Sequence, residues 1–185
     1  MWPLLPAKAG WQKFQVNRVR SRCNAERLSW YNRPMVRKIT GLDELKSVVG
    51  EELGYSSYHE VVQSQVDAFA EATGDRQWIH VDPERARSGP FGGTIAHGYL
   101  TLSLVPGLLS EVLEIEGVAM GVNYGINRVR FPAPVPVGSR VRLGAKVASV
   151  TDVGGGVQVQ LDAVIEVEGA SKPSLVSELL FRYYV

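Results

Sequence analysis

The sequence has little of three things that would each point to a class of protein. It contains a single cysteine, Cys23, so no disulfide can form within the chain, which fits a reducing compartment such as the cytoplasm. No stretch approaches the roughly eighteen consecutive apolar residues of a membrane-spanning helix, which argues against a membrane protein. The formal net charge is only +1, so the chain lacks the strong basic excess typical of nucleic-acid-binding proteins.

The basic residues that are present are unevenly placed. Residues 1–34 carry seven Lys or Arg against one acid, a formal charge of +6, which leaves −5 for the rest of the chain. The same segment holds Cys23 and three of the four tryptophans, and it shows no sustained apolar period. We predict that residues 1–34 are an atypical basic extension, disordered or not native, and that residues 35–185 form a single domain.

Three interpretations of the basic extension stay open at this point. The favoured one is upstream sequence translated from a misplaced start, with Met35 as the true first residue. The second is a mitochondrial targeting peptide, which would replace the expected cytoplasmic location by a mitochondrial one. The third is a basic arm that binds an anionic partner.

Apolar residues at helical spacing predict the elements of the first half of the chain. A capping box at Ser64 and Asp67 starts one helix, which should end at Gly74. Asp82 followed by Pro83 starts another, short helix. The remaining predicted helices are Leu42–Val49 and a long, buried one over Ile95–Leu113, which Pro106 should kink.

Beyond the long helix the apolar period changes from three or four residues to two. This alternation predicts half-buried antiparallel strands over residues 120–131, 140–147, 157–167 and 175–183, with a hairpin turn at Gly154–Gly156. A single long apolar helix before such strands buries both surfaces if the sheet curls around the helix. The expected class is therefore α+β, with one layer of helix and one of sheet.

Asp75 and His80 stand out between two of the predicted helices. Their spacing of five residues is wrong for one helix face, but a loop could fold both into one pocket. A carboxylate and an imidazole that share a pocket can hold and activate a water near neutral pH. The alternative is structural: Asp75 as a turn residue after a glycine cap, and His80 as a buried, hydrogen-bonded residue.

Three segments in order resemble the signatures of the MaoC-like (R)-specific enoyl-CoA hydratases, which have the hot-dog fold. They are Asp75–His80, the Gly-Pro-Phe-Gly-Gly-Thr-Ile-Ala-His-Gly of residues 89–98, and the proline-rich residues 130–138. The resemblance covers about Ile39–Val185 and is closest to the mycobacterial-type short hydratases. Many members have Asn-Pro where this chain has Gln77 and Trp78, which bears on the length of the substrate.

The resemblance implies a long central helix wrapped by a curved antiparallel sheet, and a reversible syn addition of water to trans-2-enoyl thioesters that gives (R)-3-hydroxyacyl thioesters. It assigns Asp75 and His80 to water activation and the N–H of Gly98 to the oxyanion. Substrate contacts are expected from Trp78, His97 and Arg130, although His97 also fits a structural or capping role. The expected partners are an acyl-CoA or acyl-carrier-protein thioester and a second copy of the chain, and no cofactor is expected.

Other functions are disfavoured by the same residues. The spacings of His59, His80 and His97 match no zinc pattern, so no metal is expected. A thioesterase on this fold usually has its carboxylate within the central helix, where this chain has acids only at the far end, Glu111 and Glu114. A non-catalytic acyl-thioester binding protein stays open. Alternating charges on the strands, Arg128, Arg130, Arg140 and Lys146, fit a solvated face as well as a coenzyme A phosphate site.

Overall fold

The structure is a computed structural model and describes residues 36–185. The predictions for residues 1–34, and for Met35 as a start, concern a segment outside the described residues.

The main element of the described chain is a six-stranded antiparallel sheet with the strand order β2-β6-β7-β8-β5, on which β3 also pairs with β6. The strands are β2 (Glu52–Tyr55), β3 (His59–Glu60), β5 (Met120–Arg130), β6 (Arg140–Val153), β7 (Gly156–Val167) and β8 (Leu175–Tyr184). The four long strands confirm the regions predicted from alternation. The predicted hairpin is also present, because Val153 pairs with Gly156 across a two-residue turn in which Gly155 has φ 79°.

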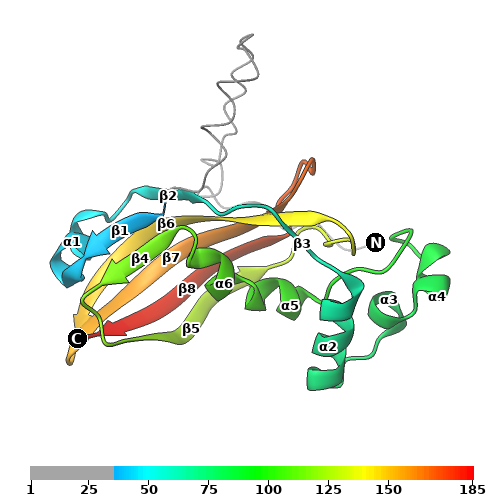
Figure 1. The fold of residues 1–185 in the computed structure, drawn as a ribbon, viewed down its shortest axis with the longest axis horizontal. Coiled ribbons are helices and arrows are strands. Elements are labelled where there is room, and N and C mark those ends of the chain that lie inside the picture. The colour runs from blue at the N-terminus through cyan, green and yellow to red at the C-terminus, as the bar shows by residue number, and fades with distance from the viewer. Residues whose placement is uncertain (1–35) are drawn as a thin grey trace, which may run out of the picture. The chain divides into compact units, whose positions relative to one another are not determined.

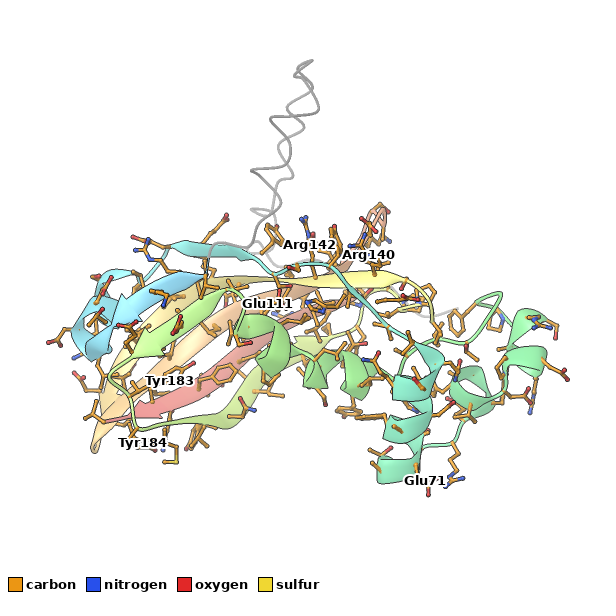
Figure 2. The ribbon with its side chains drawn as sticks, in the orientation of Figure 1. Glu71, Glu111, Arg140, Arg142, Tyr183 and Tyr184 are labelled. Carbon is orange, nitrogen blue, oxygen red and sulfur yellow. The ribbon has the colours of Figure 1, made fainter. Side chains whose placement is uncertain are left out.

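The alternation along β6 separates the core from the surface. Val141, Leu143 and Val147 are fully buried. Arg140 and Arg142, which flank Val141, point away from the core and lie on the outer side of the sheet in Figure 2. Arg140 pairs with Glu168, just after β7, and Arg142 pairs with Glu166 of β7. These strand charges are thus already paired on a solvated face.

The predicted long helix is wrong in its length and continuity. Two short helices occupy this region, α5 (Gly98–Ser103) and α6 (Val105–Leu109), and they meet at Leu104. Pro106 has no N–H to donate to the carbonyl of Leu102, so the helix ends before it and a new one begins. Both helices lie against one face of the sheet, as Figure 1 shows, which confirms the wrap of sheet around helix.

Two short strands were not predicted, whereas the first short helix was. Strands β1 (Arg37–Thr40) and β4 (Leu113–Glu116) form a separate parallel pair, so Leu113 belongs to a strand and not to the predicted helix. Four-residue strands contain too few residues to show an alternating pattern. Helix α1 (Gly41–Ser47) lies in the predicted region.

Three helices gather beyond one end of the sheet and carry the site (Figure 1). They are α2 (Gln63–Thr73), α3 (Trp78–Val81) and α4 (Pro83–Arg87). As predicted, α2 ends at Gly74, whose φ of 78° is left-handed, and the Asp82 carboxylate caps α4 by accepting from the Arg85 N–H at 3.0 Å.

The start of α2 and the loop after it differ from the predictions. Helix α2 starts one residue before Ser64, with Val62 at the cap, and the Gln65 side chain accepts from the Val62 N–H at 3.1 Å. The predicted loop contains one unforeseen helical turn, α3. At 11 residues, α2 is the longest helix within residues 36–185. No helix in these described residues is long and apolar enough to cross a membrane.

Candidate active site

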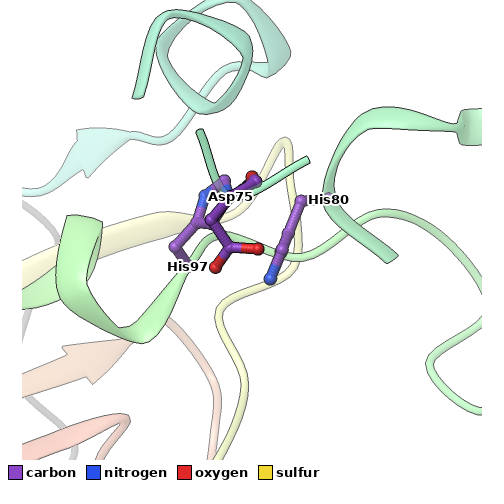
Figure 3. Close-up of side chains that lie close together, drawn as sticks. All are labelled: Asp75, His80 and His97. Carbon is purple, nitrogen blue, oxygen red and sulfur yellow. The ribbon is translucent and has the colours of Figure 1, made fainter. Parts of the chain in front are cut away.

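Asp75, His80 and His97 come together from three elements at this end of the domain. Asp75 follows the Gly74 cap of α2, His80 lies in α3, and His97 caps the start of α5. One nitrogen of each ring and one carboxylate oxygen of Asp75 lie within 4.8 Å of one another. Figure 3 shows the Asp75 carboxylate and a ring nitrogen of His80 turned toward each other.

The environment of His80 fixes its tautomer. The side chain is buried, and its Nδ1 lies 2.7 Å from the carbonyl oxygen of Ile95. A carbonyl can only accept, so Nδ1 carries the hydrogen and Nε2 keeps its lone pair. Burial lowers the pKa of His80 below its ordinary value, and the nearby His97 acts in the same direction; the bond to Ile95 and the Asp75 carboxylate oppose them. His80 is therefore a neutral base at neutral pH.

The His97 side chain contacts both His80 and the backbone of Asp75. Its ring stacks on that of His80 with centroids 3.8 Å apart, and its Nε2 donates to the backbone carbonyl of Asp75 at 2.9 Å. Phe69 of α2 packs on its other side with ring centroids 5.0 Å apart. Within the described residues, Nδ1 of His97 is buried and has no hydrogen-bond partner. This placement favours the structural role of His97 over a direct contact with substrate.

The same three side chains do not have the geometry of a metal site. A metal bound by two imidazoles lies in both ring planes, about 2 Å from each nitrogen. The planes of His80 and His97 are stacked and tilted by only 26°, so they do not meet near the ring edges. The third histidine, His59, lies elsewhere and pairs with Glu111 through its Nε2 at 2.5 Å.

A cavity of about 310 Å³ opens beside His80, within the size range of small-ligand pockets. Its walls are mostly apolar and come from the segment before α5, from α5 and from the proline-rich loop after β5, with two hydroxyl residues. The lining residues are His80, Phe91, Ile95, Ala96, Gly98, Thr101, Phe131, Pro132, Ala133, Pro134, Val135 and Ser174. An apolar slot of this kind suits a hydrocarbon group next to a polar reacting end.

Gly98 lines this cavity as the first residue of α5. The N–H groups of a first helical turn have no intrahelical acceptor, so they can donate to a ligand. A Cβ at this position would lie 3.0 Å from the Phe131 ring. The close packing of Phe131 explains why a glycine stands here.

Trp78 and Arg130 lie apart from the cavity lining. The Trp78 ring packs against Gly89, where a Cβ would lie 2.9 Å from it, and the Arg85 guanidinium sits 4.5 Å from the ring centroid. Arg130 is exposed at the end of β5, and its Nη1 donates to the Val129 carbonyl at 2.6 Å. Substrate contacts by these two residues stay predictions.

Two residues that contact this site were not singled out from the sequence: Gln63, and Thr94 of the residue 89–98 segment. Gln63 donates to the backbone carbonyl of His80 at 2.8 Å and accepts from the Thr94 hydroxyl at 2.6 Å. They are 31 residues apart, and no spacing rule connects them.

Comparison with known proteins agrees with this architecture. Residues 44–168 match the family described as MaoC like domain. The chain is 50% identical over 149 residues to 3-hydroxyacyl-thioester dehydratase Z of Mycobacterium tuberculosis H37Rv, covering 80% of this chain and 99% of that protein. It is 45% identical over 140 residues to nodulation protein N of Rhizobium leguminosarum bv. viciae, covering 74% and 86%.

A solved structure shows the same fold. The (R)-hydratase from A. caviae involved in PHA biosynthesis superposes with a TM-score of 0.60 at 26% identity, covering 72% of this chain and 94% of that one. The curved sheet around α5 and α6 is thus the hot-dog fold predicted by resemblance. Family match, sequence identity and fold agree: the chain belongs to the MaoC-like hot-dog dehydratases and is a hydro-lyase.

Proposed function

We propose that this protein is an (R)-specific enoyl-thioester hydratase, which adds water reversibly across the double bond of trans-2-enoyl thioesters to give (R)-3-hydroxyacyl thioesters. One observation carries the proposal: an Asp75 carboxylate oxygen lies within 4.8 Å of a ring nitrogen of the neutral His80 imidazole, and His80 lines an apolar cavity of about 310 Å³. The names of the dehydratase Z and (R)-hydratase relatives support the same reaction class.

The spacing of the pair suits a single water. A water with two hydrogen bonds of about 2.8 Å, at an angle near 105°, spans about 4.5 Å between its partners. A ring nitrogen of His80 and a carboxylate oxygen of Asp75 lie within 4.8 Å of each other. Asp75 and His80 take a proton from the water while the water oxygen bonds to C3 of the enoyl group. They then return that proton to C2. Because both steps use one water site, the addition is syn, and dehydration follows the same path in reverse.

The charge that develops on the thioester oxygen needs a donor fixed in advance, typically worth a few kcal/mol of the barrier. The Gly98 N–H supplies it in this proposal, since Gly98 lines the cavity and begins α5. The reaction needs no cofactor, because the chain's own acid and base move the proton. The substrate is an acyl group carried on coenzyme A or on acyl carrier protein.

A thioesterase is a weaker alternative because of the state of Glu111. This residue follows α6, and its carboxylate is engaged by His59 Nε2 at 2.5 Å and by the Ser57 N–H at 2.9 Å. A carboxylate held by two donors between loop and helix is poorly placed to attack a thioester or to activate water. Its contacts instead tie the β2–β3 segment to the end of α6.

We also propose that the protein is a homodimer joined along β5. Among the described strands β5 pairs only with β8, so its outer edge has unpaired backbone groups. Three exposed apolar side chains of this strand, Met120, Val122 and Tyr124, form a row on the face of the sheet that carries Arg182. Ile126, beyond a register shift, is exposed on the opposite face, where it pairs with Leu179. A second copy of β5 would satisfy the edge and cover this row.

The absorbance of a conjugated enoyl thioester tests the proposal. A hydratase lowers the ultraviolet absorbance without releasing thiol and yields the (R)-3-hydroxy product on chiral analysis. Release of free thiol would instead indicate a thioesterase. An unchanged spectrum with measurable binding would indicate a non-catalytic binding protein.

A further inference from the structure

We propose that Gln63 is a positioning residue that holds the His80 imidazole in its reactive tautomer. The inference rests on the proposed function, in which Nε2 of His80 handles the proton. Gln63 lies outside the cavity lining, and its effect passes through hydrogen bonds to the chain segments on both sides of His80.

The Gln63 carboxamide connects three elements. It is the first residue of α2, and its Nε2 donates to the His80 carbonyl and to the Asp67 carboxylate, each at 2.8 Å. Its Oε1 accepts from the hydroxyl of buried Thr94 at 2.6 Å. Both the nitrogen and the oxygen of this planar carboxamide are therefore hydrogen-bonded. The Gln63 side chain thus fixes α3 relative to the segment that precedes α5.

That segment sets the tautomer of His80. Thr94 is followed by Ile95, whose carbonyl accepts from Nδ1 of His80 at 2.7 Å and whose N–H donates to the Ile79 carbonyl at 3.0 Å. The Nδ1 bond leaves the lone pair on Nε2. If the Thr94–Ile95 segment shifts against α3, this bond lengthens and the hydrogen is free to move to Nε2.

The same residue also relates His80 to Asp75. Helix α2 begins at Gln63 and ends at Thr73, two residues before Asp75. Gln63 ties this helix to the backbone of His80, so the acid and the base are held from one rigid element. An error of about 1 Å between reacting groups can cost about 100-fold in rate, which makes this tie matter for turnover.

A merely structural role for Gln63 would have a different signature. The side chain is only half-buried, so its replacement leaves no cavity in the core. In Gln63→Glu the shape is kept and the carboxylate still accepts from Thr94, but it cannot donate to the His80 carbonyl. The matched control is Gln65→Glu, the same change on the same helix, in which the acceptor for the Val62 N–H is retained.

The experiment combines ¹⁵N NMR of the His80 ring in the resting enzyme with steady-state kinetics. In the wild type and in Gln65→Glu we expect one neutral tautomer, protonated on Nδ1. In Gln63→Glu we expect a mixture of tautomers and a kcat about tenfold lower, with KM within about twofold. Thr94→Val, which lacks the hydroxyl, should show the same mixture and serves if Gln63→Glu does not fold.

The tautomer measurement does not depend on turnover, so the two proposals can fail separately. A wild type without hydratase activity, together with a changed tautomer in Gln63→Glu, would overturn the proposed function and support the positioning role. An active wild type, with an unchanged His80 tautomer and kcat in both Gln63→Glu and Thr94→Val, would overturn the positioning role alone.

Discussion

The rings of His80 and His97 stack with their centroids 3.8 Å apart and their planes tilted by 26°. The stack gives the base a flat, buried support, and Nε2 of His97 holds the Asp75 backbone at 2.9 Å at the same time. Acid and base are therefore positioned by one side chain that touches both. The site and the assembly can be tested in five ways.

Asp75→Asn and His80→Asn should each lower the rate of hydration by about 100-fold or more, because each removes one proton-transfer group. Loss of enoyl-thioester absorbance measures the rate, and circular dichroism checks that the fold is kept. The control is Asp82→Asn, the same change on the next acid along the chain, since asparagine also caps a helix. Wild-type activity in either site variant would refute the assignment.

The fall of kcat/KM toward low pH, its acid limb, should have its midpoint below pH 6.5. The pKa of His80 is lowered chiefly by burial, so the base stays neutral, and active, at a pH where an ordinary imidazole is already charged. The stability contributed by this group is lost as pH falls below 6.5, because the unfolded chain then binds a proton that the folded chain does not.

Replacing His97 should move this limb. His97 lowers the pKa of His80, and its ring also shields the His80 ring from water. His97→Asn should therefore raise the midpoint of the acid limb toward pH 6.5. A pH profile of kcat/KM for both proteins makes the comparison. An identical limb in the variant would show that the stack does not tune His80.

Gly98→Ala should lower activity by about tenfold or more and reduce the free energy of unfolding by about 1–3 kcal/mol, because the new Cβ would press on the Phe131 ring. Kinetics and thermal unfolding measure the two effects. Gly107→Ala is the matched control in α6, where an added Cβ meets nothing within 4 Å. Equal activity of the two variants would contradict the role of Gly98.

A charge on an exposed apolar side chain of β5 should separate the proposed dimer. Tyr124→Glu and Ile126→Glu would each place a carboxylate in an apolar interface, and we expect monomers by analytical ultracentrifugation. Thr151→Glu changes an exposed position on β6 and should leave the assembly unchanged. A wild type that is monomeric at all concentrations would refute the dimer.

The sequence predicted best those features that repeat along the chain. The long strands β6, β7 and β8 alternate over most of their length, and their regions were found, as was that of β5. The helix over Ile95–Leu113 was overestimated because its apolar period runs on through Pro106 and into β4. One-turn α3 and the parallel β1–β4 pair are too short to show a period.

For the site, sequence reasoning identified Asp75 and His80 as neighbours because only a short loop separates them. It could not show the stack of His97 on His80 or the links from Gln63, since these contacts depend on the path of the chain through three dimensions. Gln63 and Thr94 carry no charge, and although Thr94 lies within the residue 89–98 segment, nothing in the sequence links it to Gln63. Polar residues of this kind become visible only when their hydrogen-bond partners are known.

Leu104 joins α5 to α6, and one backbone hydrogen bond of a continuous helix is missing beside it. Pro106 cannot donate to Leu102, so the ladder of bonds that would transmit a movement along a continuous helix is interrupted there. The two helices stay coupled, because Leu104 bonds to Leu100 and to Leu108, each at 3.1 Å, and Leu100, Leu108 and Leu109 share one hydrophobic core. The wall of the cavity that begins at Gly98 is thus held in place by the same packing that keeps the protein folded.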